Sequence, residues 1–376
     1  MNKTTKIVWW VVGVVVVVGL VWWGVSKNTA QGGTVKIGFM GPMTGDNATM
    51  GINGLAAVGI ARDEINAAGG ISGRQVEIVS EDSKCDATAA ADAASKLVNV
   101  DGVVAIIGGL CSSETLAAIP IAQAGHVPMI SYGSTNPKIT TAGDYKYRFV
   151  PSDNFQGKFA ADYIVNTLKA KRVAILYCLS DWCVGLHDVA KARLTEIGVN
   201  VVDEEGFQQG TQDLRTQLTK IKAANPDVVY FPSYTNEAIV GFEQAKQLGL
   251  KAQMVGGDGW DDPTIPAKAG AAANGALYTV TANEQLPQSF IDEMARRTNG
   301  AQIIIYSPRA YDIMKAYGMI MQNVGANGEK INAALKNNFT YKGIADTYTL
   351  DQNGDDVTAM FAVKQYVGGK IQDVGK

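Results

Sequence analysis

Short apolar runs alternate with longer amphipathic segments along most of this chain. The runs are rich in Val and Ile and stop at Gly, Pro, Ser or Asp, while the segments between them carry apolar residues at helical spacing. Such runs are typical of strands covered on both faces of a parallel sheet. The alternation therefore predicts an α/β protein built from strand–helix–strand units with right-handed crossovers.

Two series of these units follow one another, and 376 residues are enough for two domains. The first series predicts strands at Thr34–Met40, Gln75–Ser80, Val103–Ile107, Val127–Ser131 and Tyr147–Val150. The second predicts strands at Arg172–Tyr177, Val199–Glu204, Val228–Phe231, Ala252–Val255 and Leu277–Val280. Its helices are expected at Phe155–Leu168, Leu186–Ile197, Asp213–Ala224 and Glu237–Leu248. A long helix at Tyr306–Val324 and strands at Tyr348–Leu350 and Ala359–Tyr366 would close the chain.

The amino-terminal segment has a different character from the rest. Ile7–Ser26 contains no charge and is dominated by valine, and the segment is long enough to span a bilayer as a helix. Lys3 and Lys6 precede it, and tryptophan pairs lie near both of its ends. We expect one transmembrane anchor, with the rest of the chain outside the cytoplasm, in the periplasm or on the outer face of the cell membrane. A cleaved signal peptide is the alternative, although its apolar core would be long and Asn28–Ala30 is a poor cleavage site.

Composition and motifs argue against an enzyme and against a nucleic-acid-binding protein. The formal net charge is −3, and no basic stripe interrupts the sequence. The two histidines, His126 and His187, do not have metal-ligand spacing, and no nucleophile elbow occurs. The spacing of Gly38, Gly41 and Gly45 is not that of a dinucleotide-binding loop. We therefore expect no catalytic residue, no metal site, no cofactor and no nucleic-acid partner.

The clearest candidate for a ligand site is the stretch Gly102–Pro137. It reads as a buried strand, a loop with Cys111, Ser112 and Ser113, a helix, a second buried strand, and the polar loop 133–137. Loops that follow parallel strands emerge at the same edge of the sheet, where open α/β sheets bind ligands. A serine cap leaves the first-turn N–H groups of the helix free for an anion. Two hydroxyl-rich loops therefore predict a site for a small polar ligand.

Three loops of the second series repeat this arrangement after successive strands. They are Tyr177–Gly185, Phe231–Glu237 and Val255–Asp262. They supply three aromatic side chains and two acidic ones, namely Trp182, Tyr234, Trp260, Glu237 and Asp258. One such aromatic residue is usually a packing residue, but three loops at one edge favour a site that faces the first lobe.

The chain has four cysteines, Cys85, Cys111, Cys178 and Cys183. An even number in a chain expected outside the cytoplasm predicts disulfides. Three pairings are possible, of which pairing within each lobe is the most economical. Free buried thiols are the alternative.

Several of these stretches resemble the branched-chain amino-acid-binding protein family, the type I substrate-binding proteins of ABC importers. The similar stretches are VKIGFMGPMTG, ARDEINAAGGISGRQVEIVSEDSKCDATAA, VVAIIGGLCSSET, VPMISYGSTNP, FPSYTNEA and VGGDG. The resemblance implies two doubly wound parallel-sheet lobes, joined by three hinge crossings near residues 151–154, 280–283 and 341–348. Residues 1–33 would be the anchor or signal segment with its linker. The first lobe would comprise 34–151 and 283–344, and the second 152–282 and 345–376.

The resemblance also implies roles for individual residues. The ligand's carboxylate would meet Ser112, the Gly133 backbone and Thr135. Its ammonium group would meet Asp258, and the aromatic clamps would be Trp182 and Tyr234. The family's disulfide matches Cys85–Cys111, whereas Cys178 and Cys183 have no counterpart and are expected to pair with each other. Cys111 and Glu237 complete the candidate ligand-binding residues.

The implied function is the extracytoplasmic binding of an amino acid, branched-chain or related, and its delivery to the permease subunits of an ABC importer by a monomer. Three positions depart from the family pattern. Asp258 replaces the Glu of leucine-binding members, Trp182 replaces their Tyr, and Met50 lies where relatives often have Tyr. The amino-acid class is therefore a firmer expectation than leucine itself. A tethered sensor of the same fold, or a binder of amides, urea or small carboxylic acids, remains the alternative.

Overall fold

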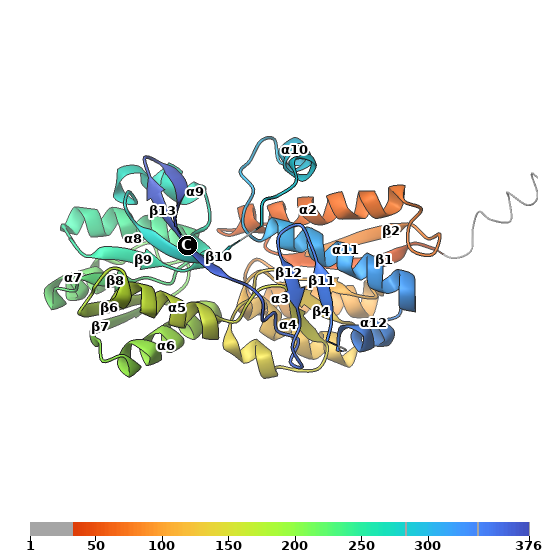
Figure 1. The fold of residues 1–376 in the computed structure, drawn as a ribbon, viewed down its shortest axis with the longest axis horizontal. Helices are drawn as coiled ribbons and strands as arrows, with labels where there is room; N and C mark the ends of the chain where they lie inside the picture. The colour runs from red at the N-terminus through yellow and green to blue at the C-terminus, as the bar shows by residue number, and fades with distance from the viewer. Residues whose placement is uncertain (1–32, 283, 337, 376) are drawn as a thin grey trace, which may run out of the picture.

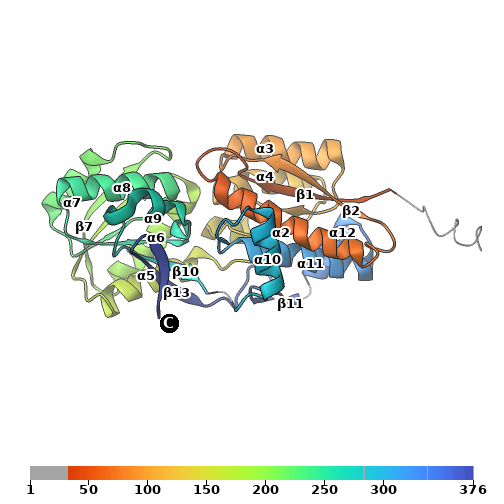
Figure 2. The same cartoon turned by 90° about the horizontal axis from the view of Figure 1, so that it is seen from above.

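The computed structural model describes residues 33–282, 284–336 and 338–375, which form two lobes lying side by side (Figure 1). Each lobe contains a twisted β-sheet with helices packed on it, as the same molecule seen from above also shows (Figure 2). The predicted anchor, Ile7–Ser26, lies outside the described residues. Within the described residues, every helix is too short or too polar to cross a bilayer.

The first lobe is built on a five-stranded sheet in the order β2-β1-β3-β4-β5. Its strands are β1 (Val35–Gly41), β2 (Val76–Asp82), β3 (Ile106–Ile107), β4 (Met129–Ser131) and β5 (Lys146–Arg148). All four strand pairs are parallel, as the strand–helix alternation predicts. The loops that follow β3 and β4 therefore leave the sheet at the same edge.

Helices cover both faces of this sheet. They are α2 (Ala48–Ala67), α3 (Ala87–Lys96), α4 (Ser112–Ala124), α10 (Gln288–Arg297), α11 (Ser307–Val324) and α12 (Gly328–Leu335). Helix α2 packs against α11 on one face, and α3 packs against α4 on the other. Ile107 and Ile130 enter the core shared with α2 and α11, whereas Ile106 and Met129 enter the core under α3 and α4. Burial on both faces explains why these strands are apolar throughout.

The second lobe contains a seven-stranded sheet in the order β14-β13-β10-β9-β8-β6-β7. Its strands are β6 (Arg172–Cys178), β7 (Asn200–Phe207), β8 (Val228–Tyr230), β9 (Gln253–Gly256), β10 (Leu277–Thr281), β13 (Phe361–Val367) and β14 (Lys370–Gly375). The strands from β10 to β7 are parallel, and β13 and β14 run antiparallel at the edge. Its helices are α5 (Asp153–Asn166), α6 (Asp181–Glu196), α7 (Arg215–Ala224), α8 (Thr235–Leu248) and α9 (Thr264–Ala269). Short helical turns occupy Leu97–Asp101, Pro137–Thr141, Asp258–Trp260 and Gly270–Ala272.

A two-stranded ribbon, β11 (Thr340–Lys342) and β12 (Thr347–Thr349), packs on the first lobe. Just after it, Asp355 forms a buried ion pair with Arg148 of β5, with a 2.8 Å separation between Nε and Oδ1. From β13 onward the chain pairs with β10 of the second sheet instead. The lobe boundaries stay a prediction, and these contacts favour a third crossing at residues 357–360 rather than at 341–348.

The predicted strands and long helices agree with the structure to within a few residues, except at one helix start. Helix α6 begins at Asp181 rather than at Leu186, because Ser180 caps it and accepts a hydrogen bond from the Cys183 N–H at 3.4 Å. Trp182 and Cys183 therefore lie in the first helical turn. The sequence analysis does not identify α9, α12, β11 or β14, because each is too short to carry a strong periodic pattern.

Candidate functional site

The two hydroxyl groups predicted to bind a carboxylate lie on neighbouring loops of the first lobe. The expected serine cap is wrong, because Cys111 occupies the cap position and Ser112 is the first residue of α4. Ser112 is buried, and its Oγ accepts a hydrogen bond from the Asn136 N–H at 3.1 Å. The hydroxyl hydrogen of Ser112 is thus still available to an acceptor. The buried Thr135 hydroxyl, in the loop after β4, makes no hydrogen bond to another described residue. With the first-turn N–H groups of α4, these hydroxyls form a set of donors suited to an anion.

Gly133 allows these two loops to approach each other closely. A Cβ atom at Gly133 would lie 2.6 Å from the Leu110 Cδ1 atom and 3.0 Å from the Leu110 carbonyl oxygen. Any side chain at this position would therefore push the loops apart. The sequence-based role of Gly133 as a backbone contact is compatible with this packing, and it stays a prediction.

Glu114 connects the loop after β3 to the loop after β2 through hydrogen bonds. Its carboxylate is fully buried and accepts hydrogen bonds from the N–H groups of Cys85 and Cys111 at 2.8 Å and of Leu110 at 2.9 Å, and from the Ser83 hydroxyl. Burial raises the pKa of Glu114 to about 7, although these hydrogen bonds act in the opposite direction. The sequence analysis missed this residue, which the capping-box position three residues after Cys111 would have revealed.

Both expected disulfides are present in the structure. Cys85 is joined to Cys111, and Cys178 to Cys183, so that no described cysteine is free. The first disulfide links the loop after β2 to the start of α4. The second links the end of β6 to the first turn of α6, where Trp182 lies.

Trp182 and Tyr234 form an aromatic wall on the second lobe. Their ring centroids are 4.9 Å apart, and both side chains are buried. A Cβ atom at Gly259 would lie 2.5 Å from the Trp182 ring, and one at Gly257 would lie 3.2 Å from it. Glycines on both sides of Asp258 therefore let the indole ring rest on this turn. Trp260, also expected as a wall, lies instead in the core of the lobe and donates from Nε1 to Ser233.

Asp258, the expected partner of an ammonium group, already has a partner for each carboxylate oxygen. Oδ1 accepts from Gln156 Nε2 at 3.1 Å, and Oδ2 accepts from the Tyr306 hydroxyl. Burial raises the pKa of Asp258 to about 6, and Asp261 acts in the same direction. Tyr306 comes from the segment before α11, which the sequence analysis did not connect to the site.

A second carboxylate, that of Asp153, lies in the same region and was missed by the sequence analysis. Asp153 begins α5, is fully buried, and donates its N–H to the Thr135 carbonyl oxygen at 2.8 Å. Neither of its carboxylate oxygens makes a hydrogen bond to another described residue. Burial raises the pKa of Asp153 well above its usual range, the nearby Asp258 raises it further, and Thr135 and Arg148 oppose these effects. The site thus contains two neighbouring buried carboxylates.

Glu237 has a structural contact at the start of α8. One carboxylate oxygen accepts a hydrogen bond from the Gly210 N–H at 2.6 Å, while the other makes none to a described residue. Burial raises the pKa of Glu237, and Asp46 of the first lobe acts in the same direction. A role in ligand binding stays a prediction for Glu237 and equally for Cys111.

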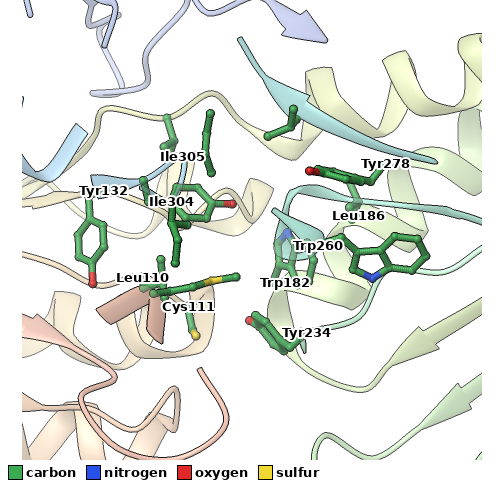
Figure 3. Close-up of a cluster of buried hydrophobic side chains, with 14 of the residues drawn as sticks. Leu110, Cys111, Tyr132, Trp182, Leu186, Tyr234, Trp260, Tyr278, Ile304 and Ile305 are labelled. Carbon is green, nitrogen blue, oxygen red and sulfur yellow. The ribbon is translucent and has the colours of Figure 1, made fainter. Parts of the chain in front are cut away.

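The two lobes touch along an interface that contains these candidates, which we call the interlobe interface. Figure 3 shows Leu110, Cys111 and Tyr132 of the first lobe across from Trp182 and Tyr234 of the second. At its rim, Asn136 donates a hydrogen bond to the Asp181 carbonyl oxygen, and Lys138 lies 3.5 Å from the Asp181 carboxylate. Two surface cavities of about 500 and 340 Å³ lie elsewhere, and no candidate residue lines either of them.

The fold and this interface define the class of protein. Residues 34–370 match the model of the periplasmic binding protein family, and the chain belongs to that family. Among curated relatives, it is 33% identical over 349 residues to the leucine-, isoleucine-, valine-, threonine- and alanine-binding protein of Pseudomonas aeruginosa, covering 91% of this chain and 92% of the relative.

Solved structures of the same class superimpose over nearly the whole chain. A leucine-binding protein of Thermotoga maritima has a TM-score of 0.84 at 29% identity, with 90% of this chain and 97% of that chain covered. A branched-chain amino-acid transporter substrate-binding protein of Streptococcus pneumoniae, solved with isoleucine, has a TM-score of 0.82 at 28% identity, with 91% and 100% covered. These relatives support a type I periplasmic binding protein fold with parallel sheets.

Proposed function

We propose that this chain binds an α-amino acid between its lobes, outside the cytoplasm, and delivers it to the permease of an ABC importer. The observation that carries the proposal is the arrangement of charge at the interlobe interface. Hydroxyl and backbone N–H donors lie on the first lobe, at Ser112, Thr135 and the start of α4. Two buried carboxylates, Asp153 and Asp258, lie beside them. A zwitterion is complementary to this pattern.

The carboxylate end of the ligand would bind to the first lobe. The N–H groups at a helix amino terminus and the hydroxyls of Ser112 and Thr135 favour a negative charge. Hydrogen bonds to charged groups contribute about 1.5–3 kcal/mol each, so two hydroxyls and several N–H groups are enough for tight binding. Gly133 would bring its backbone close to the same group.

The ammonium end would bind between Asp153 and Asp258. An ammonium group donates three hydrogen bonds, and both oxygens of Asp153 and the oxygen of the Thr135 hydroxyl are unused acceptors. Asp258 would add a second negative charge while it keeps its hydrogen bonds to Gln156 and Tyr306. We therefore assign the direct ammonium contact first to Asp153, with Asp258 as its partner. This assignment extends the sequence-based one, in which Asp258 acts alone.

The side chain of the ligand would lie against Trp182 and Tyr234. These rings, with Leu110 and Cys111 across the interface, are apolar surfaces that favour an aliphatic side chain. Closing the lobes would exclude water from both charged ends, so that contacts made only in the closed state drive the closure. No chemical step is needed for this function, and we propose that the chain is not an enzyme.

Binding of amino acids is tested directly by a thermal-shift and calorimetry panel on residues 34–376. The panel contains L-leucine, L-isoleucine, L-valine, L-threonine and L-alanine, with acetamide, urea and benzoate as ligands that lack the zwitterion. We expect at least one amino acid to bind with a micromolar or lower Kd and to raise the Tm. Binding of only the amide, urea or aromatic acid would reject the amino-acid assignment.

The proposal also covers the location of the chain and its protein partners. The family supports an extracytoplasmic chain, and the uncharged span Ile7–Ser26 supports a helical tether to the membrane. We further propose a monomer that docks on permease subunits. Amino-terminal sequencing of the protein from native membranes should find Met1 or a residue before Ile7. A mature start near Gln31 would replace the tether with a cleaved signal peptide.

A further inference from the structure

The disulfide Cys178–Cys183 encloses the part of the second lobe that faces the first lobe. The disulfide joins the last residue of β6 to the first turn of α6, across a sequence separation of 5 residues. Both cysteines are fully buried. Between them, Trp182 forms the aromatic wall and Asp181 forms the contacts at the rim.

Chain-entropy arguments make this disulfide a weak source of global stability. The stabilisation from a disulfide grows with the length of the loop that it closes. Cys85–Cys111 spans a sequence separation of 26 and restrains the unfolded chain more strongly than a separation of 5 does. The benefit of Cys178–Cys183 is therefore expected in the local geometry of the ring that it closes.

Trp182 keeps its contacts with Tyr234 and the Gly257–Gly259 turn when the lobes are apart, because these residues lie on the same lobe. Ser180 caps α6, and its hydroxyl lies 3.1 Å from Cys178 Sγ. Asp181 has its rim contacts, with Asn136 and Lys138, on the opposite lobe. Opening of the lobes removes the contacts of Asp181, so that the disulfide and the cap are left to hold the backbone at that residue.

We propose that the Cys178–Cys183 disulfide is a positioning element for ligand binding. It holds Trp182 against the Gly257–Gly259 turn and keeps Asp181 directed at the first lobe before the lobes close. A preorganised turn lowers the conformational entropy lost on binding. The affinity part of this proposal rests on the proposed function, whereas the preorganisation of the turn does not.

The first test needs no ligand. Hydrogen exchange is compared between the wild type and C178S/C183S, which keeps a similar side-chain volume; C178A/C183A is the second variant if buried hydroxyls prevent folding. We expect peptides covering residues 179–184 to exchange at least tenfold faster in the variant, with β8 and β9 unchanged. Unchanged exchange at 179–184, or faster exchange throughout the lobe, would overturn the proposal.

The second test is a double-mutant cycle on affinity, with the amino acid that the wild type binds most tightly. We expect C178S/C183S to weaken binding about tenfold, and W182A to weaken it by at least as much. The combined variant should be no weaker than W182A alone, because the disulfide acts through Trp182. If the fold-changes in Kd of C178S/C183S and W182A multiply in the combined variant, the disulfide does not act through Trp182 and has only a structural role. The same holds if C178S/C183S lowers the Tm and leaves the affinity unchanged. If no amino acid binds the wild type, the proposed function fails while hydrogen exchange still decides this inference.

Discussion

Replacing Asp153 with Asn should change ligand affinity and protein stability in opposite directions. The side chain is fully buried, its two oxygens have no hydrogen bond to a described residue, and Asp258 raises its pKa. In the ligand-free protein, this charge is therefore a cost, because a buried carboxylate without a partner is poorly solvated. In the complex, the same charge would meet an ammonium group.

The magnitudes follow from these contacts. A charge-assisted hydrogen bond contributes about 1.5–3 kcal/mol, and removing one member of a buried charge pair costs about 2–5 kcal/mol. Taking about 2 kcal/mol for D153N gives a Kd about 30-fold higher. The free energy of unfolding of the ligand-free variant should rise by about 1 kcal/mol, because the neutral amide avoids repulsion with Asp258.

Calorimetry gives the affinity and chemical denaturation gives the stability. D258N is the matched control, since it removes the same charge from a side chain that accepts hydrogen bonds from Gln156 and Tyr306. The control should lose affinity, but it should gain less stability than D153N, because these hydrogen bonds are lost together with the charge. If D153N binds within threefold of the wild type, or is no more stable than D258N, Asp153 is not the ammonium partner.

Three further predictions concern the same interface. Affinity for the amino acid should fall as the pH is lowered through about 6, where Asp258 takes up a proton. The stability of the ligand-free protein should change in the opposite direction, because folding raises the pKa of Asp258. The stabilisation from protonated Asp258 is largest below pH about 4 and is lost as the pH rises through about 6. A pH series of calorimetry and Tm measurements checks both signs, and an affinity that is flat from pH 5 to 8 contradicts them. S112A/T135A should weaken binding at least tenfold with little change in Tm, and calorimetry that finds unchanged affinity would move the carboxylate elsewhere. C85A/C111A should lower the free energy of unfolding by about 3–4 kcal/mol; a loss below about 1 kcal/mol in urea denaturation would contradict the chain-entropy argument.

Much of the fold could be predicted because its strands carry a two-sided apolar pattern. Runs such as Val103–Ile107 and Val127–Ser131 have no exposed face, and only a parallel sheet between helical layers buries them fully. The loops after β3 and β4 then converge for topological reasons alone. The short elements were missed because their stability comes from the lobe on which they pack.

The site could be predicted only where its residues follow a strand. Ser112, Thr135 and Asp258 each follow a strand closely, in a loop or at the first residue of the helix or helical turn that comes next. Asp153 is the first residue of α5 and Tyr306 lies just before α11, and nothing in their local sequence places them beside Asp258. Their proximity depends on how the two lobes are oriented, which periodicity does not encode. The complete burial of Asp153 could not be predicted from the sequence either, because an Asp at the start of a helix is usually exposed and stabilises the helix dipole.

The central claim is that a zwitterion lies between the lobes with its ammonium group at two aspartates. A crystal structure of residues 34–376 with the amino acid that binds most tightly tests it most directly. The account predicts that the ligand nitrogen lies within about 3.2 Å of an Asp153 oxygen, with Asp258 beside it, and that the carboxylate lies at Ser112 and Thr135. A ligand bound in the reverse orientation, or outside the interlobe interface, would contradict it.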